Sequence, residues 1–207
     1  MTRFAQTERA ALCDTAARVG PAAPTLDEGW TVKDLLVHLL VREGSLASVG
    51  IAVAPLKRFA DRAYAKTGQQ PFATLVEKVR TGPPRLSPFA IPKLDELGNT
   101  MEFFVHHEDI RRAQPSWEPR VLGDEVEATL WGGLGKMLAR KAPDGLVVEH
   151  SGTGASKTLK EGTPSVTVRG LPSEVTLFMT GRSEQARVDL LGDAAVIARL
   201  RDTSLGM

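Results

Sequence analysis

The stretch NTMEFFVHHEDIRRA, residues Asn99 to Ala113, places the strongest constraint on how this chain folds. It inserts two histidines, two glutamates and an aspartate among apolar residues of the kind that form a core helix. On a helical wheel with roughly 100° per residue, Glu102, His106 and Asp109 share one face, and apolar side chains flank that face on both sides. A polar stripe inside an apolar arc is the reverse of an ordinary amphipathic helix. The pattern therefore predicts that these ionisable side chains point into the core of a helical domain.

Buried carboxylates are costly unless a cation compensates them, and a metal ion is one such cation. Glu102 and His106 stand about one helical turn apart, so their side chains project one above the other and suit a shared divalent metal. His38, in the apolar helix DLLVHLL, is the candidate for a third ligand. Two histidines and one carboxylate leave coordination positions open for water or substrate. Asp109 would then orient the other ring nitrogen of His106.

Metal-free interpretations of the same residues stay open. A histidine in an apolar helix is often a hydrogen-bonded core residue, and Glu-x-x-x-His pairs occur in helices by chance. Glu102 could instead form a structural ion pair with Arg112 or Lys33. On the helical wheel, four neighbouring polar residues lie off this face and are expected to face solvent or to contact the ligands from behind. They are Thr100, His107, Glu108 and Arg111. The tandem histidines are therefore expected to differ, with His106 as the ligand.

The composition excludes several classes of protein. The chain has 207 residues with 25% charged residues and a formal net charge of +1, which gives no field for nucleic acid or an acidic membrane. The single cysteine, Cys13, rules out a disulfide within the chain and is predicted to be a buried, inert thiol. The N-terminus lacks the apolar core of a signal peptide, and no apolar run reaches the roughly 20 residues of a membrane helix. We expect a cytoplasmic protein, either a monomer or a homodimer.

Hydrophobic periodicity predicts an α+β protein with a helical part, residues 1–142, followed by a small α+β module, residues 143–207. The expected helices of the first part are Thr7–Val19, a helix that Thr31 and Asp34 cap at its start, Ala54–Lys66, Phe72–Arg80, Ile91–Ala113 and Asp124–Lys141. The expected strands of the second part are Leu146–His150, Ser165–Arg169 and Ala186–Leu191. Its expected helices are Ser173–Thr180 and a last one that Asp193 caps and that runs through Leu200.

Two segments identify a resemblance. GWTVKDLLVHLLVRE, Gly29 to Glu43, and NTMEFFVHHEDIRRA together resemble the metal-binding DinB-like superfamily, in particular the mycothiol-dependent maleylpyruvate isomerase family of actinobacteria. FFVHHEDIRRAQP is also similar to a sub-branch of uncharacterised metal-binding proteins. GLPSEVTLFMTGRSEQARVDLLGD, Gly170 to Asp193, is similar to the family's C-terminal segment. The resemblance implies an up-and-down four-helix bundle followed by a sterol-carrier-like α+β module. It also implies that His38, Glu102 and His106 are metal ligands, with Asp109 beside them.

The resemblance further implies a chemistry based on a small thiol. The cofactor would be a divalent metal, zinc first and nickel or iron as alternatives, and the thiol mycothiol would be the cosubstrate. A bound zinc lowers the pKa of a coordinated thiol, so the thiolate can attack an electrophilic substrate in a transferase or isomerase reaction. Arg182, after Gly181, would anchor an anionic group of substrate or thiol, or is simply a surface arginine beyond a helix end.

Three hypotheses follow for the function. The first is a metal-dependent, thiol-using enzyme, and the second is a metal- or small-molecule-binding protein without catalysis on the same fold. The third is a metal-free helical protein whose stripe is a buried polar network. A phosphate-binding loop has no support in the sequence, because HSGTGASK, His150 to Lys157, lacks the Walker spacing and fits a hairpin turn. Serine-hydrolase chemistry has none either, because no Gly-x-Ser-x-Gly elbow occurs.

Overall fold

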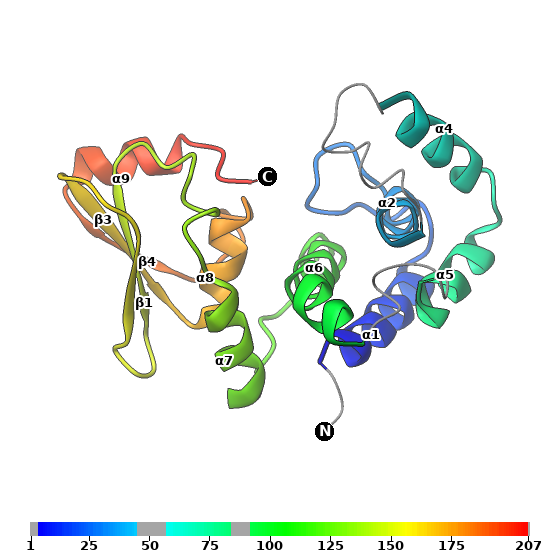
Figure 1. The fold of residues 1–207 in the computed structure, drawn as a ribbon, viewed down its shortest axis with the longest axis horizontal. Coiled ribbons are helices and arrows are strands. Elements are labelled where there is room, and N and C mark those ends of the chain that lie inside the picture. Colours follow the sequence, from blue (N-terminus) through cyan, green and yellow to red (C-terminus); the bar gives the residue numbers. More distant parts are fainter. Residues whose placement is uncertain (1–3, 45–56, 84–91, 207) are drawn as a thin grey trace. The chain divides into compact units, whose positions relative to one another are not determined.

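The structure, a computed structural model, describes residues 4–44, 57–83 and 92–206 (Figure 1). These residues form eight helices and one four-stranded sheet, which confirms the α+β class. The chain divides into two compact units, Met1–Glu118 and Pro119–Met207. Hydrophobic periodicity predicts a helical part that extends to residue 142. The units divide earlier because helix α7 (Asp124–Gly133) packs on α8 (Pro172–Met179), within the second unit.

The first unit is helical. Its helices are α1 (Phe4–Val19), α2 (Val32–Gly44), α4 (Lys57–Gly68), α5 (Phe72–Thr81) and α6 (Pro92–Arg112). Helix α1 packs on α5 and α6, and α2 packs on α4 and α5. The expected starts of two helices, at 54–56 and at 91, lie outside the described residues. None of the helices in the described ranges is long and apolar enough to cross a membrane.

The position of α2 is set by its cap and by its apolar face. The Thr31 backbone N–H and hydroxyl both donate to Asp34 Oδ2, at 2.9 and 2.6 Å, and the Asp34 N–H donates to Thr31 Oγ1 at 3.3 Å. This reciprocal cap confirms the predicted start of the helix. One core joins α2 to three other helices of the unit, and its fully buried side chains include Leu12, Leu35, Leu36, Leu39, Leu75, Phe103 and Ile110. The same helix that fills this core therefore carries His38 at a fixed place.

The second unit is built on a mixed sheet with strand order β2-β1-β3-β4. The strands are β1 (Gly145–His150), β2 (Ser156–Lys160), β3 (Ser165–Gly170) and β4 (Asp189–Gly192). Strand β1 runs parallel to β3, and the two outer strands pair antiparallel to their neighbours. Helix α8 packs against β3, and α9 (Ala194–Arg201) packs against β3 and β4.

Three elements of this unit differ from the sequence prediction. Helix α7 ends at Gly133 and not at Lys141, because Gly132, Gly133 and Gly135 make a continued helix unfavourable. Strand β2 was not predicted, since only Leu159 among its residues is buried and the sequence carries no apolar alternation there. Strand β4 is shorter than predicted. The Asp193 cap of α9 is confirmed, with its side chain accepting a hydrogen bond from the Ala195 N–H at 2.8 Å.

The packing of α1 yields a stability prediction. Leu12 is fully buried in the helical core, whereas Phe59, on α4, is 59% exposed. Leu12→Ala should lower the free energy of unfolding by about 2–5 kcal/mol, because it removes buried apolar surface and leaves a cavity. Phe59→Ala deletes a larger side chain and should cost less than about 1 kcal/mol. Urea unfolding followed by far-UV circular dichroism measures both, and equal losses would contradict the described core.

Candidate metal centre

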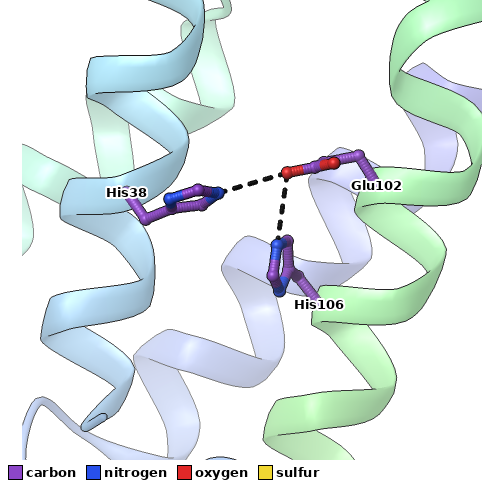
Figure 2. A group of neighbouring side chains, drawn as sticks. All are labelled: His38, Glu102 and His106. Carbon is purple, nitrogen blue, oxygen red and sulfur yellow. Dashed lines mark hydrogen bonds and ion pairs between the residues drawn. The ribbon is translucent and has the colours of Figure 1, made fainter. Parts of the chain in front are cut away.

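The three predicted ligands lie together between α2 and α6 (Figure 2). Nε2 of His38 and Nε2 of His106 each lie 3.2 Å from the same carboxylate oxygen, Glu102 Oε1. One potential ligand atom from each residue lies within 4.8 Å of the others. The three side chains are 12–17% exposed, so the group is largely screened from solvent and still reachable.

The far side of each imidazole ring is held by a hydrogen bond. His106 Nδ1 donates to Asp109 Oδ2 at 2.9 Å, and the Asp109 side chain is fully buried. His38 Nδ1 lies 2.9 Å from the hydroxyl of Tyr64 on α4. The Trp30 ring packs beside the His38 ring, with centroids 5.2 Å apart. Both rings are thus oriented with Nε2 toward Glu102, the arrangement that outer partners give to metal-binding histidines.

The tautomer of His106 requires a proton or a metal ion between its Nε2 and the Glu102 carboxylate. A carboxylate only accepts hydrogen bonds, so Asp109 keeps the hydrogen of a neutral His106 on Nδ1. Nε2 then carries a lone pair that faces the Glu102 oxygen, which is also an acceptor. Two acceptors 3.2 Å apart repel each other unless a proton or a metal ion lies between them. The geometry therefore fits either a protonated His106 or a bound metal.

In the metal-free protein, these contacts determine the pKa values of His106 and Glu102. Burial alone would lower the pKa of His106, but hydrogen bonds to Asp109 and Glu102 and their charges outweigh it and raise the pKa to about 9. Burial alone would raise the pKa of Glu102, but hydrogen bonds from His106 and His38, with the charges of His106 and Arg42, hold it well below its usual range. Glu102 is therefore an anion at neutral pH, which a divalent metal requires of this ligand.

Arg42 is a fourth member of the group that the sequence analysis missed. Its Nε lies 3.1 Å from Glu102 Oε1, so Glu102 pairs with Arg42 and not with Arg112 or Lys33. Arg42 stands four residues after His38 on α2, a spacing that places both on one side of the helix and that was visible in the sequence. The guanidinium also donates to Asn99 Oδ1 on α6. Arg42 thus bridges two successive turns of α6.

Behind Arg42 the polar contacts continue into the core. Asn99 Nδ2 donates to Glu43 Oε1 at 2.6 Å, and Arg9 of α1 donates to both oxygens of Glu43 at 2.6 Å. Arg9 also donates to the carbonyl of Val79 on α5 at 3.1 Å. Arg9, Glu43 and Asn99 are at most 5% exposed. This chain of charged hydrogen bonds ties α1, α2 and α5 to the stripe on α6.

The donor set fits a divalent metal. Zinc in proteins binds imidazole nitrogen and carboxylate oxygen at about 2.0–2.2 Å, so tetrahedral ligands of one ion lie about 3.3–3.5 Å apart. The two measured separations of 3.2 Å are close to that spacing. Three carboxylates, from Asp27, Glu102 and Asp109, and the guanidinium of Arg42 lie around the two imidazole rings.

His107 does not turn toward solvent as the wheel suggested. It is 3% exposed, its Nδ1 donates to Glu8 Oε1 at 2.8 Å, and its Nε2 lies 2.9 Å from Thr15 Oγ1, both on α1. Glu108 is likewise buried, paired with Arg111 and Arg112 at 2.7 and 2.6 Å. The expectation failed because α6 is covered by α1 on that side as well. The two histidines still differ, since only His106 faces Glu102.

The remaining candidates lie elsewhere. Arg182 belongs to the second unit, is half-buried, and donates to the Thr180 carbonyl at 2.6 Å. Cys13 is fully buried, and burial raises the pKa of its thiol to about 11 against the opposing charges of Arg80 and Arg9, as expected for an inert thiol. The segment after His150 forms the turn between β1 and β2, with the Gly154 N–H donating to the His150 carbonyl at 2.8 Å.

Tyr64 and Asp27 could not have been found from the sequence. Tyr64 lies on α4, in a segment whose periodicity carries no sign of the site. Asp27 Oδ2 lies 3.7 Å from His106 Nδ1, in the loop before α2. It is there because the Leu26 N–H donates to the carbonyl of Asp109 at 3.1 Å, which ties this loop to α6. A long-range backbone contact of this kind leaves no local sequence pattern.

Comparison with solved structures shows that the fold is a known one. The structure of a mycothiol-dependent maleylpyruvate isomerase superposes over 92% of both chains with a TM-score of 0.63 at 15% identity. A histidine-to-alanine mutant of a mycothiol-dependent maleylpyruvate isomerase superposes over the same shares with a TM-score of 0.61 at 16% identity. No protein-family model and no curated protein sequence matches the chain. At such identities the likeness establishes the fold.

The raised pKa of His106 predicts how the stability of the metal-free protein changes with pH. Because the folded pKa, about 9, lies above the ordinary 6.5, protonated His106 contributes stability in full below pH 6.5 and loses it as the pH rises through 9. The free energy of unfolding in EDTA should therefore fall by up to about 3 kcal/mol over this range. His106→Gln should remove that component. An equal pH dependence in both proteins, measured by urea unfolding, would contradict the assignment.

Proposed function

We propose that the chain is a divalent-metal-dependent enzyme that uses a low-molecular-weight thiol, mycothiol, as cosubstrate, of the thiol S-transferase or maleylpyruvate isomerase type. One observation carries the proposal, namely two imidazole Nε2 atoms that converge on one Glu102 oxygen while Asp109 and Tyr64 hold their far sides. The fold likeness to mycothiol-dependent maleylpyruvate isomerase supports it. Under this proposal the first unit is a DinB-like four-helix bundle and the second a sterol-carrier-like module.

His38, Glu102 and His106 would hold the metal, zinc in the first place and nickel or iron as alternatives. A metal held there lowers the pKa of a thiol that coordinates it and so makes the thiol nucleophilic at neutral pH. Asp109 fixes the ring of His106, and Arg42 adds a positive charge next to the ligands. The charge of Arg42 favours binding of an anionic small molecule over a neutral one beside the metal ligands.

Arg182 is proposed to anchor a carboxylate of the electrophilic substrate or of the thiol. Its side chain is partly exposed, and its Nη1 donates to the Thr180 carbonyl. The planar guanidinium fork suits a two-point contact with a carboxylate. The partners of the protein would then be a small thiol and an electrophilic small molecule.

A second candidate function is a metal- or small-molecule-binding protein without catalysis. The contact between Arg42 and Glu102 favours it, because a guanidinium on the ligand oxygen gives the carboxylate a partner with no metal bound. A third candidate, a purely structural polar network, rests on the same contact and on the buried bonds behind it. Metal analysis separates the third candidate from the other two, and thiol turnover separates the first from the second.

The metal proposal predicts one zinc per chain, bound by three defined residues. His38→Ala, Glu102→Ala and His106→Ala should each weaken zinc binding by on the order of 100-fold or more, since even loss of an outer partner costs about 10–100-fold. Mass spectrometry for metal content and competition with a chromophoric chelator measure the stoichiometry and the affinity. His107→Gln is the matched control, because His107 is the adjacent histidine and bonds to Glu8 instead.

The control should keep full zinc content even if it is less stable. A wild-type protein that remains metal-free after loading with zinc, nickel or iron would rule out both metal-based functions and leave the structural network.

The enzymatic proposal predicts metal-dependent consumption of mycothiol. Zinc-loaded protein incubated with mycothiol and a bimane electrophile should form the thioether much faster than thiol and electrophile alone, and Glu102→Gln should abolish the difference. Arg182→Met should raise KM for an anionic substrate by about tenfold with zinc content unchanged. Arg201→Met, an exposed arginine on α9, is its control. Absence of turnover across a panel of electrophiles would favour the binding function.

A further inference from the structure

The two imidazole rings of the site have outer partners of different chemistry. Asp109 only accepts hydrogen bonds, whereas the Tyr64 hydroxyl both donates and accepts. Tyr64 is the single tyrosine of the chain, and its hydroxyl lies 2.9 Å from His38 Nδ1. Asp109 therefore fixes one arrangement of His106, while Tyr64 is compatible with either tautomer of His38.

In the metal-free protein Glu102 needs a donor from His38. Glu102 Oε1 accepts from the Arg42 guanidinium at 3.1 Å and lies 3.2 Å from His38 Nε2, so the hydrogen of a neutral His38 is best placed on Nε2. Nδ1 then carries the lone pair, and the Tyr64 hydroxyl donates to it. From Tyr64 through His38 to Glu102, each hydrogen-bond donor then meets an acceptor.

Metal binding through Nε2 requires the other tautomer. A metal takes the Nε2 lone pair, so the imidazole hydrogen must move to Nδ1. Nδ1 then donates and the Tyr64 oxygen accepts over the same 2.9 Å contact. We propose that Tyr64 is the positioning residue of His38 and that metal loading reverses the direction of the hydrogen bond between them.

This inference rests on the proposed metal function and adds a role for a residue outside the ligand set. With Trp30 and Lys33, the Tyr64 side chain also lines a cavity of about 450 Å³. Once its oxygen accepts from His38, the hydroxyl hydrogen of Tyr64 no longer points at the imidazole ring and can be donated to another acceptor. A carboxylate partner such as Asp109 has no hydrogen to release in this way.

Nitrogen NMR of the histidine rings tests the reversal directly. The chain has four histidines, and the His38→Gln variant assigns the signals of His38. In EDTA, the ¹⁵N shifts should show the hydrogen of His38 on Nε2, and after one equivalent of zinc they should show it on Nδ1. A His38 that carries its hydrogen on the same nitrogen in both states would overturn the proposal. Wild-type protein that binds neither zinc nor nickel nor iron would instead overturn the metal function itself.

The Tyr64→Phe variant tests the contribution of the hydroxyl. It keeps the ring and removes the hydrogen bond, so zinc affinity should fall by about tenfold. The Thr81→Val variant removes a hydroxyl that bonds to the Glu77 carbonyl on α5 and should leave zinc affinity unchanged. An unchanged affinity in Tyr64→Phe, with wild-type zinc content, would show that the hydroxyl does not position His38.

The single tyrosine supplies a second readout that does not depend on affinity. With 3-fluorotyrosine in the chain, one ¹⁹F signal reports on residue 64 alone. Zinc should shift this signal in the wild-type protein and leave it unshifted in His38→Ala, even where that variant still binds zinc at high concentration. A tyrosine with a merely structural role would give a signal that does not respond to zinc.

Discussion

The carboxylate of Glu102 is the group on which the helical unit depends. Three nitrogen atoms converge on its Oε1, at 3.1 and 3.2 Å, from helices α2 and α6. An anion at this depth is stable only with such partners, and it therefore fixes the facing positions of His38 and Arg42. Because the carboxylate is already ionised, the proposed divalent metal would take the place of a proton beside it. The same interaction thus supports both the fold and the proposed metal centre.

Helix α6 is polar on two sides that are both buried. One side presents Glu102, His106 and Asp109, and the other presents His107 to Glu8 and Thr15 of α1. Buried hydrogen-bonded networks of this kind define a unique arrangement of helices, because any shift leaves donors and acceptors unsatisfied. The chain from Arg9 through Glu43 and Asn99 to Arg42 acts in the same way across three helices, α1, α2 and α6.

Much of this organisation could be predicted from the sequence. The period of α2 and the reciprocal cap of Thr31 and Asp34 are local signals, and the structure confirms both. The wheel of α6 brought Glu102, His106 and Asp109 to one face correctly, and it misplaced His107 because a wheel gives angles and not the number of sides that neighbours cover. Tyr64 lies on a helix with no marker of the site, and β2 is an edge strand with one buried residue. Such features depend on contacts between distant segments, which a single sequence does not encode locally.

The central claim is that one metal ion lies where the two imidazoles meet the carboxylate. Crystals of the zinc-loaded protein, measured at the zinc absorption edge, test it most directly. We expect one strong anomalous peak in the first unit, about 2.0–2.2 Å from Nε2 of His38, Nε2 of His106 and a carboxylate oxygen of Glu102. A peak on the opposite side of His106, between Asp27 and Asp109, or no peak in the first unit, would contradict it.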